Sequence, residues 1–122
     1  MYEIIAETSF SAAHHLRDYQ GSCERVHGHN WLVRAFVQCE QLNELGLGID
    51  FRDLRAHLRE AVAPLDHADL NEAFTGAKGN PSSENIARHL FDTLSKRIND
   101  GRCRIARVEV QETPGSCAAY FE

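Results

Sequence analysis

The chain has 122 residues, of which 43 % are hydrophobic and 25 % are charged, as is usual for one globular domain with a single core. We therefore treat residues 1–122 as one domain. Its formal net charge of −5 argues against a nucleic-acid partner, because such proteins usually carry a basic surface. No apolar run approaches the ~20 residues needed to cross a bilayer, and the N-terminus lacks a signal-peptide pattern. We expect a cytoplasmic protein with no membrane partner.

The first half of the chain predicts two strands followed by a helix. Residues 2–16 begin with β-forming residues, and residues 29–40 are rich in aromatic and β-branched residues. Residues 50–65 predict a helix, because Asp50 is a suitable N-cap, apolar residues recur at helical spacing, and Pro64 marks an end.

The second half predicts a helix followed by two strands. Residues 71–80 are expected to form a loop, and residues 81–98 a helix with an apolar stripe. Residues 103–113 alternate imperfectly between apolar and polar side chains, and the turn at residues 114–115 would return the chain as a strand over 116–122. This order predicts an α+β fold, with a four-stranded antiparallel sheet and two helices on one face. Oligomerisation would cover the sheet edges.

Four cysteines are present, and in a cytoplasmic protein they are expected to stay reduced and unpaired. Cys39, Cys103 and Cys117 lie in apolar strand segments, so we assign them to the core. Cys23 lies in a polar loop close to histidines, where a lowered pKa would make a reactive thiolate.

The histidines of "CERVHGHN" are the strongest candidates for metal ligands. His27 and His29 alternate, so in a strand both imidazoles point to one face. His14 or His15, on the preceding strand, would supply a third nitrogen. Three imidazoles with one open position are typical of a catalytic zinc, whereas Cys23 as a fourth ligand would close a structural site. Both interpretations stay open on spacing alone.

Three acidic and imidazole side chains elsewhere are weaker candidates. Asp66 and His67 are adjacent, which alone does not make a hydrogen-bonded pair. Glu112 stands at the end of a strand, where a carboxylate is usually solvated but can also hold an amino-pyrimidine edge through paired hydrogen bonds.

The motifs "FSAAHHL", "CERVHGHN", "IDF", "LDHADLN", "NPSSENIARHLF" and "VEVQETPGSCAAY" together resemble the 6-pyruvoyltetrahydropterin synthase family in order and spacing. The resemblance runs from Phe10 to Tyr120 and is closest to the compact bacterial 6-carboxytetrahydropterin synthases of queuosine biosynthesis. It implies a tunnelling fold (T-fold) that oligomerises into a barrel, as a trimer or hexamer with active sites between subunits.

The resemblance also implies roles for individual residues. Zn²⁺ would be held by His14, His27 and His29, with His14 preferred to His15 because it directly follows the Ala-Ala pair. Cys23 would transfer protons, assisted by Asp66 and His67. Glu112 would anchor the pterin ring, and Ser82, Ser83 and Glu84 would lie beside it. Apart from the resemblance, the chain shows no Gly-rich phosphate cradle, so the basic candidates for the triphosphate are Arg17, Arg25 or Lys78.

The implied reaction converts 7,8-dihydroneopterin triphosphate to 6-carboxy-5,6,7,8-tetrahydropterin, releasing acetaldehyde and triphosphate. The absence of long insertions favours this branch, and Cys23 disfavours a branch with glutamate at that position. The alternatives are triphosphate elimination to 6-pyruvoyltetrahydropterin, or a non-catalytic zinc- or pterin-binding module.

Overall fold

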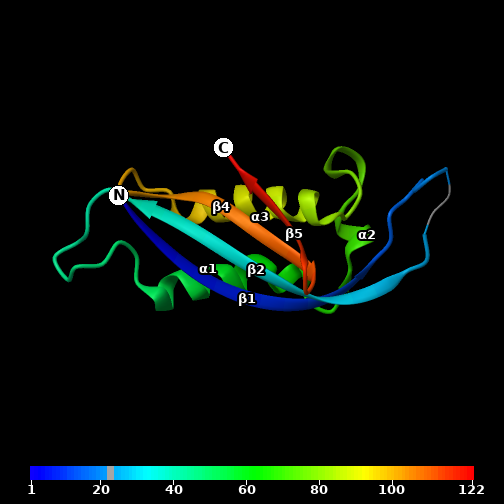
Figure 1. Ribbon diagram of the computed structural model, residues 1–122, viewed down its shortest axis with the longest axis horizontal. Coiled ribbons are helices and arrows are strands. Elements are labelled where there is room, and N and C mark those ends of the chain that lie inside the picture. Colours follow the sequence, from blue (N-terminus) through cyan, green and yellow to red (C-terminus); the bar gives the residue numbers. More distant parts are fainter. Residues whose placement is uncertain (22–23) are drawn as a thin grey trace.

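The computed structural model describes residues 1–21 and 24–122, and within them the chain forms one twisted sheet with helices packed on a single face (Figure 1). The strand order is β3-β1-β2-β4-β5. The strands are β1 (Tyr2–His14), β2 (His27–Cys39), β3 (Ala68–Asp69), β4 (Cys103–Thr113) and β5 (Ser116–Phe121). The helices are α1 (Phe51–Val62), η1 (Ala63–Leu65), α2 (Leu70–Ala73), η2 (Gly76–Lys78) and α3 (Ser83–Ile98). The predicted α+β T-fold architecture is confirmed.

The two long helices lie within the predicted ranges 50–65 and 81–98, but α1 ends at Val62, where the 3-10 turn η1 follows, and α3 begins at Ser83. The Asp50 carboxylate accepts a hydrogen bond from the Arg52 N–H at 2.7 Å, and the Ser82 hydroxyl accepts one from the Asn85 N–H at 3.2 Å. Such caps satisfy N–H groups that have no partner inside the helix. Both helices bury apolar stripes against β1, β4 and β5, and this places the core between the helices and the sheet.

A bulge explains the imperfect alternation of β4. Phe36 pairs with Arg107 and Val37 pairs with Ile105, so Ala106 is an extra residue without a partner on β2. Such a bulge inserts one residue and shifts the alternation. Ile105 before it and Val108 after it consequently both face the core.

The sheet differs from the predicted one in its minor strand. Within the described residues it has five strands rather than four, because Ala68–Asp69 pairs with β1 in parallel over two residues. The expected loop over 71–80 contains most of α2 and the 3-10 turn η2. These elements are too short for periodicity to reveal them.

The cysteine predictions are wrong in two respects. Cys39 and Cys103 are cross-strand partners of β2 and β4 and form a disulfide, with their Cα atoms 4.4 Å apart. Cys117 is exposed on β5 rather than in the core, because it faces away from the helices. Among the described residues, no helix is long and apolar enough to cross a membrane.

Gly48 marks a close approach between a loop and the sheet. A Cβ atom there would lie 2.5 Å from Ile4 Cδ1 and 2.9 Å from Cys39 Sγ. We expect Gly48→Ala to lower the free energy of unfolding by about 1–3 kcal/mol, measured by urea denaturation, because the bonded sulfur cannot move aside. Gly28→Ala is the control, since its Cβ would meet only the Ala12 carbonyl oxygen, at 3.8 Å. Equal stabilities of the two variants would contradict the close packing.

Candidate metal centre

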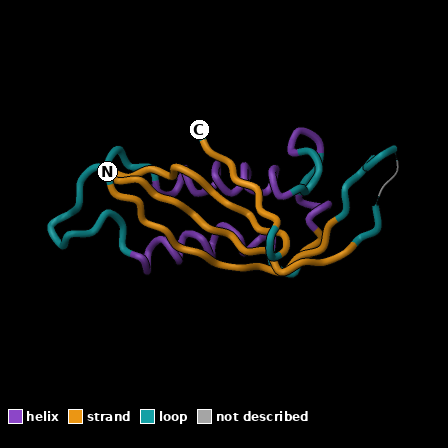
Figure 2. The backbone as a smooth tube through the Cα atoms, viewed as in Figure 1, coloured by secondary structure: helices purple, strands orange, loops and turns teal. Residues whose placement is uncertain are grey.

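The register of β1 against β2 brings three histidines together at one end of the hairpin. His14 pairs with His27, and His29 lies two residues further along β2 on the same face. The Nε2 atoms of His14 and His27 are 3.1 Å apart. The hairpin end projects beyond the β4–β5 turn, so this corner extends from the body of the sheet (Figure 2).

Glu112 joins the three histidines from β4. Gln111 pairs with Cys117 and Thr113 pairs with Ser116, so Glu112 is the extra residue of a second bulge. Its Oε1 atom lies 3.0 Å from His14 Nε2 and 3.1 Å from His29 Nε2. The ligand atoms of the four side chains all lie within 4.8 Å of one another. Bulges next to functional sites commonly redirect a side chain in this way.

Backbone carbonyls orient two of the imidazoles. His14 Nδ1 lies 2.7 Å from the Pro81 carbonyl oxygen, and His27 Nδ1 lies 2.8 Å from the Arg25 carbonyl oxygen. Each carbonyl can only accept, so each Nδ1 carries the proton and each Nε2 presents a lone pair to the cluster. Metal-bound histidines usually have such an outer partner.

These donors fit a zinc ion. Tetrahedral Zn–N bonds of about 2.05 Å place neighbouring nitrogens roughly 3.3 Å apart, close to the 3.1 Å between His14 and His27. His29 Nε2 is buried and makes no hydrogen bond with any described residue, because its approach to Glu112 lacks hydrogen-bond geometry. A buried nitrogen without a partner is costly unless something else binds it. The cluster can therefore hold a metal ion.

His15 does not belong to the cluster. Its backbone N–H and carbonyl bind the side-chain amide of Asn71, each at 2.9 Å, and its ring lies beside that amide. The alternation of β1 explains why His14 and not His15 joins the cluster, because His14 shares the helix-facing side with Phe10 and Ala12.

Asp66 and His67 form a pair at the outer edge of β1. His67 Nδ1 lies 3.0 Å from Asp66 Oδ1. The same carboxylate accepts the Ser11 N–H at 3.0 Å, and this bond, reinforced by His67, holds the pKa of Asp66 below its usual range. His67 has a positive φ of 55°, and its side chain is 82 % exposed. The His67 ring is exposed to solvent, and neither residue of the pair belongs to the histidine cluster.

The remaining candidates occupy different positions. Ser82 caps α3 directly after Pro81, and Ser83 and Glu84 begin the first turn of that helix. Cys23 lies outside the described residues. Of the basic candidates, Arg25 is exposed, Lys78 borders a hollow near Phe74 and His89, and Arg17 is half-buried with its guanidinium bound to the protein. Of the residues predicted to bind substrate or metal, only Lys78 borders this hollow.

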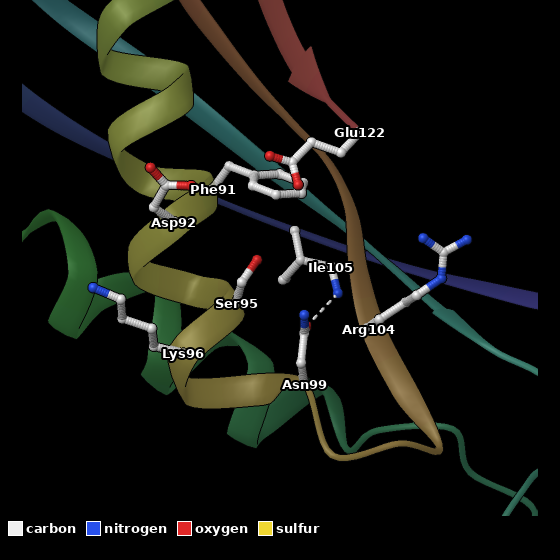
Figure 3. Close-up of a pocket in the computed structure, with 8 residues that line it drawn as sticks. All are labelled: Phe91, Asp92, Ser95, Lys96, Asn99, Arg104, Ile105 and Glu122. Carbon is white, nitrogen blue, oxygen red and sulfur yellow. Dashed lines mark hydrogen bonds between the residues drawn. The ribbon is translucent and has the colours of Figure 1, made fainter.

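A surface hollow of about 430 Å³ lies elsewhere, between α3 and β4 (Figure 3). Asn99 crosses it to accept the Ile105 N–H at 2.8 Å. Ile105 and Glu112 are seven residues apart on one strand, which is roughly 23 Å. The hollow is therefore remote from the histidine cluster.

Two features of the centre escaped sequence reasoning. Glu112 was predicted only as a ring anchor, although the extra residue of the β4 bulge turns it toward the histidines. The Pro81 and Arg25 carbonyls are backbone groups, for which residue type carries no signal.

Metal binding is expected to weaken as the pH falls, because protons and zinc compete for the same nitrogens. Burial lowers the pKa of His29 from its ordinary value of 6.5, so this imidazole stays neutral to more acidic pH than a free one. A chelator competition assay between about pH 5 and pH 8 should show affinity falling mainly below about pH 6.5.

His29→Ala should lower zinc affinity at least ~100-fold in the same assay, because a ligand rather than its outer partner is lost. His57→Ala on α1 is the matched control and should leave affinity unchanged, since His57 is outside the cluster. Equal affinities for the two variants would show that the histidine cluster is not where zinc binds.

Comparisons with known proteins identify the family of the chain. The family model described as 6-pyruvoyl tetrahydropterin synthase matches residues 3–122. A 6-carboxy-5,6,7,8-tetrahydropterin synthase from Synechocystis is 39 % identical, covering 99 % of this chain and 94 % of the relative. The human 6-pyruvoyl tetrahydrobiopterin synthase is 30 % identical, covering 97 % and 90 %.

A solved structure supports the fold independently. The 6-pyruvoyl tetrahydropterin synthase of Caenorhabditis elegans superposes with a TM-score of 0.83 at 23 % identity, covering 99 % of this chain and 95 % of the other. From the full-length match to the family model and the identity to its relatives, the chain belongs to the 6-pyruvoyl tetrahydropterin synthase family.

Proposed function

We propose that the protein is a zinc-dependent lyase that converts 7,8-dihydroneopterin triphosphate and one water molecule to 6-carboxy-5,6,7,8-tetrahydropterin, acetaldehyde and triphosphate. The observation that carries the proposal is the convergence of three imidazoles and a carboxylate at one sheet corner in a chain of this family. The relatives named 6-carboxy-5,6,7,8-tetrahydropterin synthase favour this product, and with it a place in queuosine precursor synthesis.

His14, His27 and His29 would hold the zinc. A bound zinc ion supplies Lewis acidity toward the two adjacent side-chain hydroxyls of the substrate, which makes the neighbouring C–H bonds more acidic. His14 is only 2 % exposed, whereas His27 is exposed. The buried ligand therefore fixes the centre in the fold, and the exposed side leaves room for substrate to approach.

Glu112 would bind the pterin ring. An ionised carboxylate accepts two hydrogen bonds, which matches the paired N–H donors of an amino-pyrimidine edge. Its proximity to His14 and His29 would keep the ring close to the histidines, so that ring and side chain are held at one centre. Ser82, Ser83 and Glu84 would line the pocket beside it.

Cys23 and His67 would move the protons. The hydrogen bond from the Ser11 N–H keeps Asp66 ionised, and Asp66 in turn orients His67 through Nδ1, which leaves His67 Nε2 for proton transfer. The ring is reduced by electrons from the substrate's own side chain, so no external reductant is needed.

The active site would form between subunits of a homo-oligomer. The Asp66–His67 pair is exposed at the outer edge of β1, which suits it to serve the centre of a neighbour. Within the described residues, β1 has no strand partner on that edge over residues 2–11, apart from the contacts of Ser11 with Asp66 and His67. The opposite edge strand is β5. Unpaired edges favour strand addition, so a trimeric barrel or a hexamer of such barrels would satisfy both.

Two other observations bear on the proposal. The human relative named 6-pyruvoyl tetrahydrobiopterin synthase favours, as second candidate, triphosphate elimination at the same site. We also propose a cytoplasmic location, against which the Cys39–Cys103 disulfide argues, because cytoplasmic thiols are usually reduced.

Product analysis tests the reaction. The zinc-loaded protein is incubated anaerobically with 7,8-dihydroneopterin triphosphate, and mass spectrometry is expected to find carboxytetrahydropterin and acetaldehyde. Pyruvoyltetrahydropterin would support the second candidate. If a zinc-loaded oligomer converts no substrate, the proposed reaction is wrong, and a non-catalytic binding module is the remaining candidate.

Matched variants assign the roles within this assay. Cys23→Ala should keep zinc and lose about 10²–10⁴-fold in turnover, as expected for a lost acid–base group. Loss of zinc with this change would indicate a structural centre closed by Cys23. Glu112→Gln should raise KM because the amide NH₂ cannot accept a ring N–H.

Mixing two inactive variants tests whether sites are shared. Cys23→Ala and His67→Ala proteins are unfolded together and refolded at equal amounts, and activity should return to about a quarter of wild type. In the refolded oligomers, about half of the sites receive an intact Cys23 from one chain. About half of these also receive an intact His67 from the neighbouring chain, so about a quarter of all sites are complete. Activity no higher than that of the separate variants would place both residues in one subunit's site.

A further inference from the structure

Arg17 binds a single segment of the chain with both terminal nitrogens of its guanidinium group. Nη2 donates to the Asn71 carbonyl at 2.9 Å and also to the Phe74 carbonyl. Nη1 lies 3.4 Å from both the Gly79 carbonyl and the Asn80 side-chain oxygen. All four acceptors belong to residues 71–80, which connect β3 to α3. The rigid fork of an arginine is suited to holding several acceptors at once.

Two asparagines of the same segment bind the backbone that follows β1. Asn71 pairs through its side-chain amide with both backbone groups of His15. Asn80 does the same with Arg17, accepting its N–H at 2.9 Å and donating to its carbonyl at 3.1 Å. Residues 71–80 are thus attached through side-chain amides to alternate residues of the backbone beyond His14.

The clamped segment ends at the group that orients His14. Asn80 is followed by Pro81, whose carbonyl oxygen lies 2.7 Å from His14 Nδ1. The Asn80 carbonyl is itself held by the Asn85 side-chain amide at 2.8 Å. Pro81 and His14 are both buried, so water cannot easily replace this contact. The position of the segment therefore decides which nitrogen of His14 carries the proton.

We propose that Arg17 is a positioning residue for the metal centre. By fixing residues 71–80 it holds the Pro81 carbonyl against His14 and selects the tautomer whose Nε2 is free to bind zinc. The inference rests on the zinc-binding part of the proposed function and not on the reaction. It replaces the predicted role of Arg17 at the triphosphate, because the guanidinium already has protein acceptors on both terminal nitrogens.

The test uses Arg17→Met, which keeps much of the apolar stem, and Arg17→Lys, which keeps the charge. Both should bind zinc about 10–100-fold more weakly in a chelator competition, as when outer partners of metal ligands are removed. Lysine should not rescue binding, because one ammonium cannot replace the fork. Arg97→Met is the control, since that exposed side chain contacts only the Glu60 carboxylate among the described side chains.

A second measurement needs no metal. The ¹⁵N chemical shifts of the His14 ring in the metal-free protein should report Nδ1–H in wild type and in Arg97→Met, and a mixture with Nε2–H in the Arg17 variants. A lowered unfolding temperature with unchanged tautomer and zinc affinity would mean a purely structural role and would overturn the proposal.

Asn80→Ala guards against failure of the Arg17 variants to fold. It removes one side-chain anchor of the segment and should shift zinc affinity and the tautomer in the same direction by a smaller factor. Unchanged values in this folded variant would also contradict the proposal. Failure of wild type to bind zinc would refute the proposed function, while the ¹⁵N shifts would still decide the role of Arg17.

Discussion

The register between β1 and β2 is the constraint on which the metal centre depends. Side chains alternate between the faces of a strand, so a shift by one residue would move every histidine of one strand to the opposite face. Thirteen consecutive residue pairs, from Tyr2–Cys39 to His14–His27, fix this register. The apolar face they bury against α1 and α3 makes any slipped pairing costly. The core therefore specifies the centre as strictly as the histidines do.

Two bulges on β4 fit this strand to the paired strands β1 and β2. The extra residue Ala106 returns Val108 and Val110 to the core after Ile105, and it thereby decides which face Glu112 meets. Glu112 is the extra residue of the second bulge and therefore has no partner residue on β5. Without the first bulge the carboxylate would point to the opposite face of the sheet. The fourth member of the cluster is thus positioned by an irregularity six residues away.

Much of this could be predicted from the sequence, and the exceptions have physical causes. Alternation places His27 and His29 on one face, whereas it left His14 and His15 both open, and the family resemblance favoured His14. Backbone carbonyls and bulges leave no residue-type signal, so the contacts of Pro81 and Glu112 emerge only from the folded chain. The cysteine prediction failed because it rested on the expected compartment, whereas strand pairing brings Cys39 and Cys103 together.

The unequal anchoring of the histidines suits a centre that must bind and release substrate. His14 is buried, contacts Trp31 edge-on, and receives its orientation from a segment clamped by Arg17. His27 is exposed and takes its orientation from the carbonyl of Arg25, only two residues away. A ligand held by distant parts of the fold keeps its position when the loop beside it moves, whereas one held locally moves with that loop. In the proposed function, substrate would approach from the exposed side of His27, while the buried His14 would keep the ion in place.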